Sequence, residues 1–106
     1  MTVWQDGILL HQWPVSTART GKVTPTGLFV PQVLVRDHRS SLYDGAPMPW
    51  SIFFSGNYAI HGTTQTDMLG TPASAGCVRL DPTDARTLFE LVRAEGLDNV
   101  LIDIQP

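Results

Sequence analysis

The sequence predicts a mainly β domain with one helix near its C-terminal end. Two turn signals, Asp6-Gly7 and Ser55-Gly56-Asn57, each separate two apolar runs, which is typical of β-hairpins. Only the segment between Asp81 and Gly96 repeats its apolar residues with a helical period. The chain has 106 residues, the length of one small domain, so we expect residues 1–106 to fold as a single unit.

Composition narrows the class of protein. Apolar residues make up 42% of the chain and charged residues 16%, which indicates a globular rather than a disordered protein. The formal net charge is −3, so the chain lacks the basic surface that binds the phosphates of a nucleic acid. The single cysteine excludes an internal disulfide and any multi-cysteine metal site.

Targeting signals are not visible in this chain. No apolar run approaches the roughly 18 residues of a membrane span, and no signal peptide is evident at the start. A cytoplasmic protein and an excised mature domain both fit this sequence, and the oligomeric state stays open.

The first two-thirds of the chain is predicted to be β. Residues 3–10 form the first hairpin, because both positions of an Asp-Gly turn need a positive φ. We expect its second strand to continue to residue 15. Residues 16–27 form a polar loop, and residues 28–35 form a strand that Pro31 interrupts.

The central third combines short strands with long loops. Residues 36–49 are predicted to be irregular, and a connection of that length often marks a functional loop. Strands are expected at 51–54 and 58–60, a glycine-rich loop at 61–76, and a short strand at 78–80.

The helix has signals at both of its ends. Asp81 is the predicted N-cap, Pro82 suits the first helical position, and Gly96 stops the helix. One apolar face contains Ala85, Leu88, Phe89 and Val92. Residues 99–104 are expected to close the chain as a strand.

Cys77 and His61 are the residues that indicate chemistry. A nucleophilic cysteine needs a thiolate, and a nearby imidazole is the usual means of lowering the thiol pKa. Gly76 lets another part of the backbone approach the thiol closely. Taken singly, Cys77 also fits a small core residue and His61 a structural histidine, and both interpretations stay open at this point.

Two separated motifs resemble the L,D-transpeptidase catalytic domain, the YkuD-like family. The family signature is a His-Gly followed, after a loop, by Ser/Thr-His-Gly-Cys, a hydrophobic residue and Arg or Asn. This chain has His61-Gly62-Thr63 and then Ser74-Ala75-Gly76-Cys77-Val78-Arg79-Leu80. The 16 positions from His61 to Cys77 resemble the compact members of the family.

Other segments resemble the same family in the same order. Thr24-Pro25-Thr26-Gly27 is similar to its Pro-Thr-Gly turn, and residues 48–54 are similar to its central strand. The resemblance covers about residues 8–104. It implies a YkuD-like β-sandwich of mixed sheets with a C-terminal helix and a closing strand.

The resemblance also implies an activity. Such a protein is a cysteine acyltransferase that acts on peptidoglycan tetrapeptide stems through a thioester at Cys77, cross-linking them or exchanging the terminal D-amino acid. It needs no cofactor and no metal, and it serves cell-wall biogenesis on the periplasmic or cell-wall side of the membrane. The acceptor is left open: a second stem, a free D-amino acid, a protein or water.

Site residues follow from the matched motifs. The implied catalytic residues are Cys77, His61, Gly62 and Gly76. His61 is the general base, the carbonyl of Gly62 fixes its tautomer, and the backbone N–H groups around Gly76 and Cys77 suit an oxyanion hole. The implied substrate-binding residues are Arg79, Ser74, Tyr58 and Thr63.

Arg79 has two interpretations. In an extended segment it points to the same side as the sulfur two residues earlier, where it would bind a substrate carboxylate. It equally suits a salt bridge to Asp81, Asp84 or another local acid. Tyr43, Trp50 and Tyr58 are candidates to line the groove, although such aromatic residues more often belong to a core.

Two features depart from the family pattern. Ala75 stands where the family usually has a histidine before Gly-Cys. This departure bears on substrate contact or on the rigidity of the loop more than on the identity of the nucleophile. The N-terminal part is also short, because family domains usually have one more strand before the Asp6-Gly7 hairpin. A sheet edge is then left unpaired or is covered by a partner strand.

Three alternatives remain at the level of sequence. One is an L,D-carboxypeptidase or amidase-type hydrolase on the same scaffold, and a second is a non-catalytic module that binds cell-wall peptides. A third is a metal protein, for which the sequence shows no paired ligand spacing. Its candidate ligands are His11, His38, His61, Asp67 and Cys77. A papain-like hydrolase is disfavoured, because there the cysteine precedes the histidine.

Overall fold

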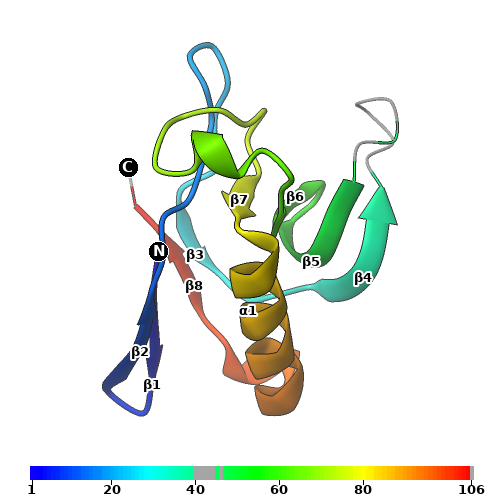
Figure 1. Ribbon diagram of the computed structural model, residues 1–106. Coiled ribbons are helices and arrows are strands. Elements are labelled where there is room, and N and C mark those ends of the chain that lie inside the picture. Colours follow the sequence, from blue (N-terminus) through cyan, green and yellow to red (C-terminus); the bar gives the residue numbers. More distant parts are fainter. Residues whose placement is uncertain (40–44, 46, 106) are drawn as a thin grey trace.

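The computed structural model describes residues 1–39, 45 and 47–105. The described strands are β1 (Thr2–Gln5), β2 (Ile8–Gln12), β3 (Gly27–Phe29), β4 (Val33–Arg39), β5 (Pro47–Ser55), β6 (Tyr58–Gly62), β7 (Val78–Leu80) and β8 (Ile102–Ile104). The one α-helix of this part of the chain, α1, spans Pro82–Glu95, and 3-10 turns occupy Thr66–Met68 and Leu97–Asn99. The prediction of a mainly β protein with one helix is confirmed (Figure 1).

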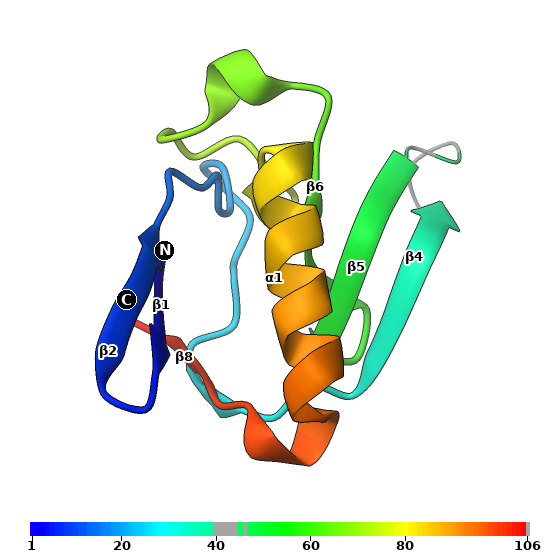
Figure 2. The same cartoon turned by 60° about the horizontal axis from the view of Figure 1, so that its bottom comes forward.

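The strands form a mixed four-stranded sheet and two smaller pairs. The larger sheet has the order β4-β5-β6-β7, in which the first two pairings are antiparallel and β6 runs parallel to β7. The pairs β1-β2 and β3-β8 are both antiparallel. In both ribbon views α1 lies between the four-stranded sheet and the β1-β2 hairpin (Figures 1 and 2).

The prediction that residues 36–49 are irregular is wrong for most of those that the structure describes. Strand β4 extends to Arg39 and β5 begins at Pro47, with His38 paired to Met48. The charged residues of β4 gave this segment a polar pattern that did not indicate a strand. They occur there because β4 is an edge strand whose polar side chains point into solvent. Residues 40–44 and 46 lie outside the described part of the chain.

Three predicted strand boundaries also change. The predicted strand 28–35 divides at Pro31 into β3 and β4, which belong to different sheets, because proline cannot donate a ladder hydrogen bond. Strand β2 ends at Gln12 rather than at residue 15. The closing strand is shorter than 99–104, since a 3-10 turn occupies Leu97–Asn99 and β8 begins at Ile102.

The two hairpins and the helix follow the prediction. Asp6 and Gly7 have φ angles of 52° and 78°, as a tight turn requires. Asp81 caps α1, its carboxylate accepting the Thr83 N–H at 2.9 Å, and Gly96 ends the helix with a φ of 92°. No helix among the described residues is long and apolar enough to cross a membrane.

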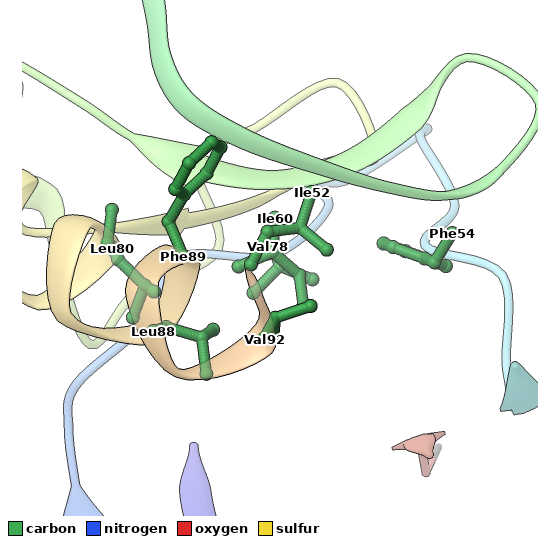
Figure 3. Close-up of a cluster of buried hydrophobic side chains, with 9 residues drawn as sticks. Ile52, Phe54, Ile60, Val78, Leu80, Leu88, Phe89 and Val92 are labelled. Carbon is green, nitrogen blue, oxygen red and sulfur yellow. The ribbon is translucent and has the colours of Figure 1, made fainter. Parts of the chain in front are cut away.

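The main core lies between α1 and the four-stranded sheet. Figure 3 shows Leu88, Phe89 and Val92 of the helix beside apolar side chains of the sheet. The sheet contributes Ile52, Phe54, Ile60, Val78 and Leu80, all of them buried. Because strand side chains alternate between faces, this packing turns the residues between them to the opposite face of the sheet.

Candidate active site

The face of the β6-β7 pair that points away from α1 carries the reactive side chains. The parallel register places Ile60 beside Val78 and His61 beside Arg79. Ile60 and Val78 belong to the core, so His61 and Arg79 share the other face. Cys77 immediately precedes β7 and is two residues from Arg79, which places its thiol on that face as well.

A cavity of about 610 Å³ opens on this face. Six of the eight sequence-predicted site residues line it: Tyr58, His61, Thr63, Ser74, Cys77 and Arg79. The remaining two, Gly62 and Gly76, are not part of the lining. They lie in the segments that carry His61 and Cys77. The structure therefore brings together side chains from β6, β7 and the loop that joins them.

His61 is held as a neutral imidazole. Its side chain is buried, with 6% exposed, and Nδ1 lies 2.6 Å from the carbonyl oxygen of Gly62. Since a carbonyl only accepts, Nδ1 carries the proton and donates, which leaves Nε2 with a lone pair. Burial lowers the pKa of His61 from 6.5 to about 4, and the nearby Arg79 cation acts in the same direction.

Cys77 is held as a neutral thiol. Its Sγ accepts the backbone N–H of Ala59 at 3.4 Å and lies 3.8 Å from the carbonyl oxygen of Asn57. Burial raises the pKa of the thiol above its ordinary value, and the Ala59 N–H and Arg79 offset only part of this rise. Burial therefore acts against the lowering of the thiol pKa for which a nearby imidazole is the usual means.

Ser74 holds the backbone of the loop that bears Cys77. Its buried hydroxyl donates to the carbonyl of Cys77 at 2.5 Å and accepts the N–H of Gly76 at 3.0 Å. The Gly76 N–H is thus already engaged in this structure and does not point to an empty oxyanion site. The role of Ser74 visible here is positional, although it also lines the cavity.

Two glycines lie where other parts of the chain approach the backbone closely. Gly76 has a φ of 133°, and a Cβ there would overlap the ring of Tyr58 and lie 2.8 Å from the carbonyl oxygen of Val23. A Cβ on Gly62 would come within 3.1 Å of Pro82 Cα, at the start of α1. These contacts explain why both motifs contain glycine at these positions.

A second segment of chain holds the loop that bears Cys77. Ser16 exchanges two backbone hydrogen bonds with Arg79, at 3.0 and 2.8 Å, and its hydroxyl donates to the carbonyl of Met68. The carbonyl of Thr17 accepts the N–H of Ser74 at 2.9 Å. Figure 1 shows this blue segment meeting the yellow-green loop at the top of the molecule. The predicted polar loop 16–27 is thus part of the site's framework.

Arg79 is not paired with an acid in the described part of the chain. Its Nη1 donates to Oε1 of Gln65 at 2.9 Å, and the ion pair of the described residues is Arg93–Glu90 on α1. The predicted salt bridge to Asp81 or Asp84 is not formed, so the guanidinium faces the cavity with a neutral partner.

Sequence reasoning missed several cavity residues. Met48 and Asn57 come from β5 and the β5-β6 turn, and Gln65 and Arg19 come from the two flanking loops. No local motif marks these four positions, because only the fold brings them to the thiol. Trp50 does not line the groove, since its ring packs edge-on against Phe89 of α1 with centroids 5.3 Å apart. Tyr43 lies outside the described residues.

The five candidate metal ligands do not gather as a set in the described part of the chain. Among the residues that the structure describes, no three His, Cys, Asp or Glu side chains gather closely enough to hold a metal ion. Within the cavity the chemistry is that of a thiol, an imidazole and two guanidinium groups.

Comparison with known proteins identifies this arrangement. The sequence model of the family described as "L,D-transpeptidase catalytic domain" matches residues 1–102, so the chain belongs to this family. A search of curated proteins finds no match.

Solved structures show the same fold. An L,D-transpeptidase from Mycobacterium smegmatis superimposes with a TM-score of 0.86 at 21% identity, over 99% of this chain and 53% of its own. An L,D-transpeptidase from Stackebrandtia nassauensis superimposes with a TM-score of 0.81 at 27% sequence identity, and the match covers 99% of this chain and 50% of that protein. L,D-transpeptidase 3 from Mycobacterium tuberculosis was solved in complex with a faropenem-derived adduct. It superimposes with a TM-score of 0.75 at 19% sequence identity, and the match covers 97% of this chain and 52% of that protein. The present chain thus spans about half the length of these proteins.

Proposed function

We propose that this member of the L,D-transpeptidase family is a cysteine acyltransferase that acts on peptidoglycan tetrapeptide stems through a thioester at Cys77. The observation that carries the proposal is the shared cavity of Cys77 and His61, in which the Gly62 carbonyl fixes the imidazole with Nε2 free to accept a proton. A thiol and an imidazole nitrogen that can accept a proton are the two groups that nucleophilic cysteine catalysis needs.

The neutral resting pair sets the order of the proton transfers. As Sγ of Cys77 attacks the scissile carbonyl, Nε2 of His61 takes the thiol proton, so the thiolate forms only during the attack. The N–H of Cys77 stabilises the oxyanion, because the N–H of Gly76 already donates to Ser74. The imidazolium then gives its proton to the departing amine of the terminal D-amino acid, and the thioester remains.

The second half of the reaction restores the enzyme. An acceptor amine attacks the thioester carbonyl, His61 removes a proton from that amine, and the same proton returns to the departing sulfur of Cys77. Water in place of the amine would give the hydrolase. Arg79 is the contact for a substrate carboxylate, since a guanidinium matches that group in geometry and charge.

An adduct found in one structural relative is consistent with this proposal. L,D-transpeptidase 3 from Mycobacterium tuberculosis was solved in complex with a faropenem-derived adduct. We assign the present chain to the cell-wall side of the membrane, because the proposed substrate lies there.

The test is intact-protein mass spectrometry after mixing the protein with a tetrapeptide stem and a free D-amino acid. We expect an acyl adduct on the wild type, none on Cys77→Ala, and an exchanged stem peptide among the products. Tripeptide without exchange would establish the hydrolase instead. A folded protein that gives neither adduct nor product would refute the acyltransferase and leave a binding module.

A further inference from the structure

Strand β5 changes the faces to which its side chains point at Trp50. Ile52 lies in the core against α1 (Figure 3). Met48 precedes it by four residues, so a regular strand would turn Met48 to the same core. Met48 is instead buried with Phe53 in a second apolar cluster, against which Cys77 packs, and it lines the cavity. The alternation of side chains along β5 is therefore interrupted between Met48 and Ile52.

The interruption is a left-handed backbone conformation at Trp50. Its φ is 57°, a value that a bulky side chain rarely adopts. No residue is inserted here, because β5 keeps one register with β4 on both sides of Trp50. The conformation thus turns β5 over without shifting its pairing. Backbone outliers of this kind persist only where the surrounding structure over-determines them, and they cluster at functional sites.

Several contacts hold Trp50 in this conformation. Its ring packs edge-on against Phe89, with centroids 5.3 Å apart. The guanidinium carbons of Arg36 and Arg86 lie 5.0 and 5.4 Å from the centroid of the indole ring, within the range of cation–π attraction. The buried hydroxyl of Ser51 bridges Trp50, since it donates to the carbonyl three residues earlier at 2.7 Å. A return of Trp50 to an ordinary φ would break these contacts.

The turned strand places Pro49 against Gly62. A Cβ on Gly62 would lie 3.2 Å from Pro49 Cγ, 3.4 Å from the Pro49 carbonyl oxygen and 3.1 Å from Pro82 Cα. The two prolines therefore enclose Gly62, one from β5 and the other from the start of α1. Gly62 supplies the carbonyl that accepts the Nδ1–H of His61 at 2.6 Å. A peptide group enclosed in this way has little freedom to turn its carbonyl aside.

We propose that the left-handed conformation at Trp50 is a positioning device for the imidazole of His61. It places Pro49 on Gly62, the contact fixes the Gly62 carbonyl, and the carbonyl keeps the proton of the neutral ring on Nδ1. Nε2 stays free to accept the thiol proton, so the inference deepens the proposed function, and its catalytic part rests on that function. Trp50 and Pro49 do not line the cavity and act through Gly62.

The first measurement is the tautomer of His61, obtained by ¹⁵N NMR of histidine-labelled protein at neutral pH. His61→Gln identifies the signals of this ring among the three histidines of the chain. Pro49→Ala removes the Cγ atom that faces Gly62. Pro82→Ala is the matched control, because the atom that Pro82 presents to Gly62 is Cα, which alanine keeps.

We expect Pro49→Ala to lower the ratio of Nδ1-protonated to Nε2-protonated His61 by about tenfold, the equivalent of one hydrogen bond. Single-turnover acylation should fall by about tenfold to hundredfold, because the base is no longer held in place. Pro82→Ala should leave both quantities close to those of the wild type. An unchanged tautomer ratio in Pro49→Ala would overturn the inference.

The second measurement separates the backbone conformation from the indole ring. Trp50→Gly and Trp50→Ala both remove the ring, but only glycine adopts a positive φ readily. We expect the tautomer ratio and the acylation rate of Trp50→Gly to exceed those of Trp50→Ala by about fivefold to tenfold. Glycine is otherwise the worse residue in a strand, so general loosening predicts the reverse order. That reverse order, or equal losses, would overturn the role of Trp50.

Circular dichroism establishes which variants are folded. Pro49→Ala keeps the Trp50 ring and its contacts, so the comparison of Pro49→Ala with Pro82→Ala decides the inference if neither Trp50 variant folds.

The two readouts distinguish failure of this inference from failure of the proposed function. Acylation by the wild type, with a His61 tautomer indifferent to Pro49 and Trp50, would leave the acyltransferase intact and refute the positioning. A tautomer that depends on Pro49, in a protein that forms no acyl adduct, would refute the acyltransferase and leave the positioning.

Discussion

The two faces of the β6-β7 pair are built from alternate residues and behave in opposite ways. On one face Ile60, Val78 and Leu80 pack against α1 and are at most 5% exposed. On the other, His61, Cys77 and Arg79 surround a cavity of about 610 Å³. Each polar residue neighbours an apolar one in sequence, so the rigid core holds the site in place through the backbone that they share.

The comparison also shows what burial does on each face. On the core face it contributes stability through apolar area removed from water. On the cavity face it keeps both His61 and Cys77 uncharged, because desolvation opposes the charged form of each. Burial on the cavity face therefore shifts the two pKa values in the directions that disfavour a resting thiolate–imidazolium pair.

Substitutions on the two faces should produce separate losses. We expect Cys77→Ala to remove acyl transfer entirely and His61→Gln to slow it by about a hundredfold to ten-thousandfold, with the fold retained. Leu80→Ala should instead cost about 3 kcal/mol of unfolding free energy, because it leaves a cavity in a fully buried site. Paired urea denaturation and single-turnover assays measure both effects. If Cys77→Ala lowered the free energy of unfolding as much as Leu80→Ala does, the result would show that the thiol is a core residue.

Gly76→Ala should affect both properties at once. Its Cβ would overlap the Tyr58 ring at a φ that side chains disfavour, so we expect a loss of about 2–4 kcal/mol in stability together with a loss of acylation. Gly70→Ala is the matched control, because its φ of 91° is also positive but nothing lies within 4 Å of the added methyl. The control should lose about 1 kcal/mol and retain acylation. Equal effects of the two substitutions would show that backbone strain alone, and not the contact with Tyr58, explains the glycine.

His61 should make stability depend on pH. Its pKa is about 4 in the folded protein and about 6.5 when unfolded, so between these values the unfolded state binds more protons. The contribution is fully present above pH 6.5 and is lost as the pH falls toward 4, by about 3 kcal/mol in all. Urea denaturation from pH 4.5 to 7.5 measures the slope, and His61→Gln should reduce it.

The helix cap should give the smallest effect. Asp81→Ala removes the carboxylate that accepts the Thr83 N–H, and we expect about 1 kcal/mol less stability. Because Pro82 packs near Gly62, acylation reports whether fraying at the start of α1 reaches the site. A change in the acylation rate greater than about threefold would show that fraying of the first turn of α1 alters the geometry of the cavity.

The sequence predicted those parts of the molecule whose signals are local. The Asp6-Gly7 turn, the cap at Asp81 and the apolar face of α1 each lie within a few residues, and all three are confirmed. The strand through the charged residues 36–39 was not predictable in this way, because its stability comes from pairing with Met48 and its neighbours.

The same distinction applies to the site. The motifs around His61 and Cys77 indicated the residues that share the cavity, because both occupy short continuous segments. Arg19 and Gln65 had no such signal, since only tertiary hydrogen bonds bring their loops to the thiol. The protonation states were also beyond the sequence, because they depend on how deeply each group is buried.

The most direct test of the account is the pH dependence of Cys77 acylation in a single turnover, measured from pH 3.5 to 8 on protein shown to be folded by circular dichroism. A neutral His61 that acts as the base predicts an acylation rate that is constant from pH 7 to 5 and falls around pH 4. Loss of acylation centred near pH 6.5, or acylation that His61→Gln leaves unchanged, would contradict it.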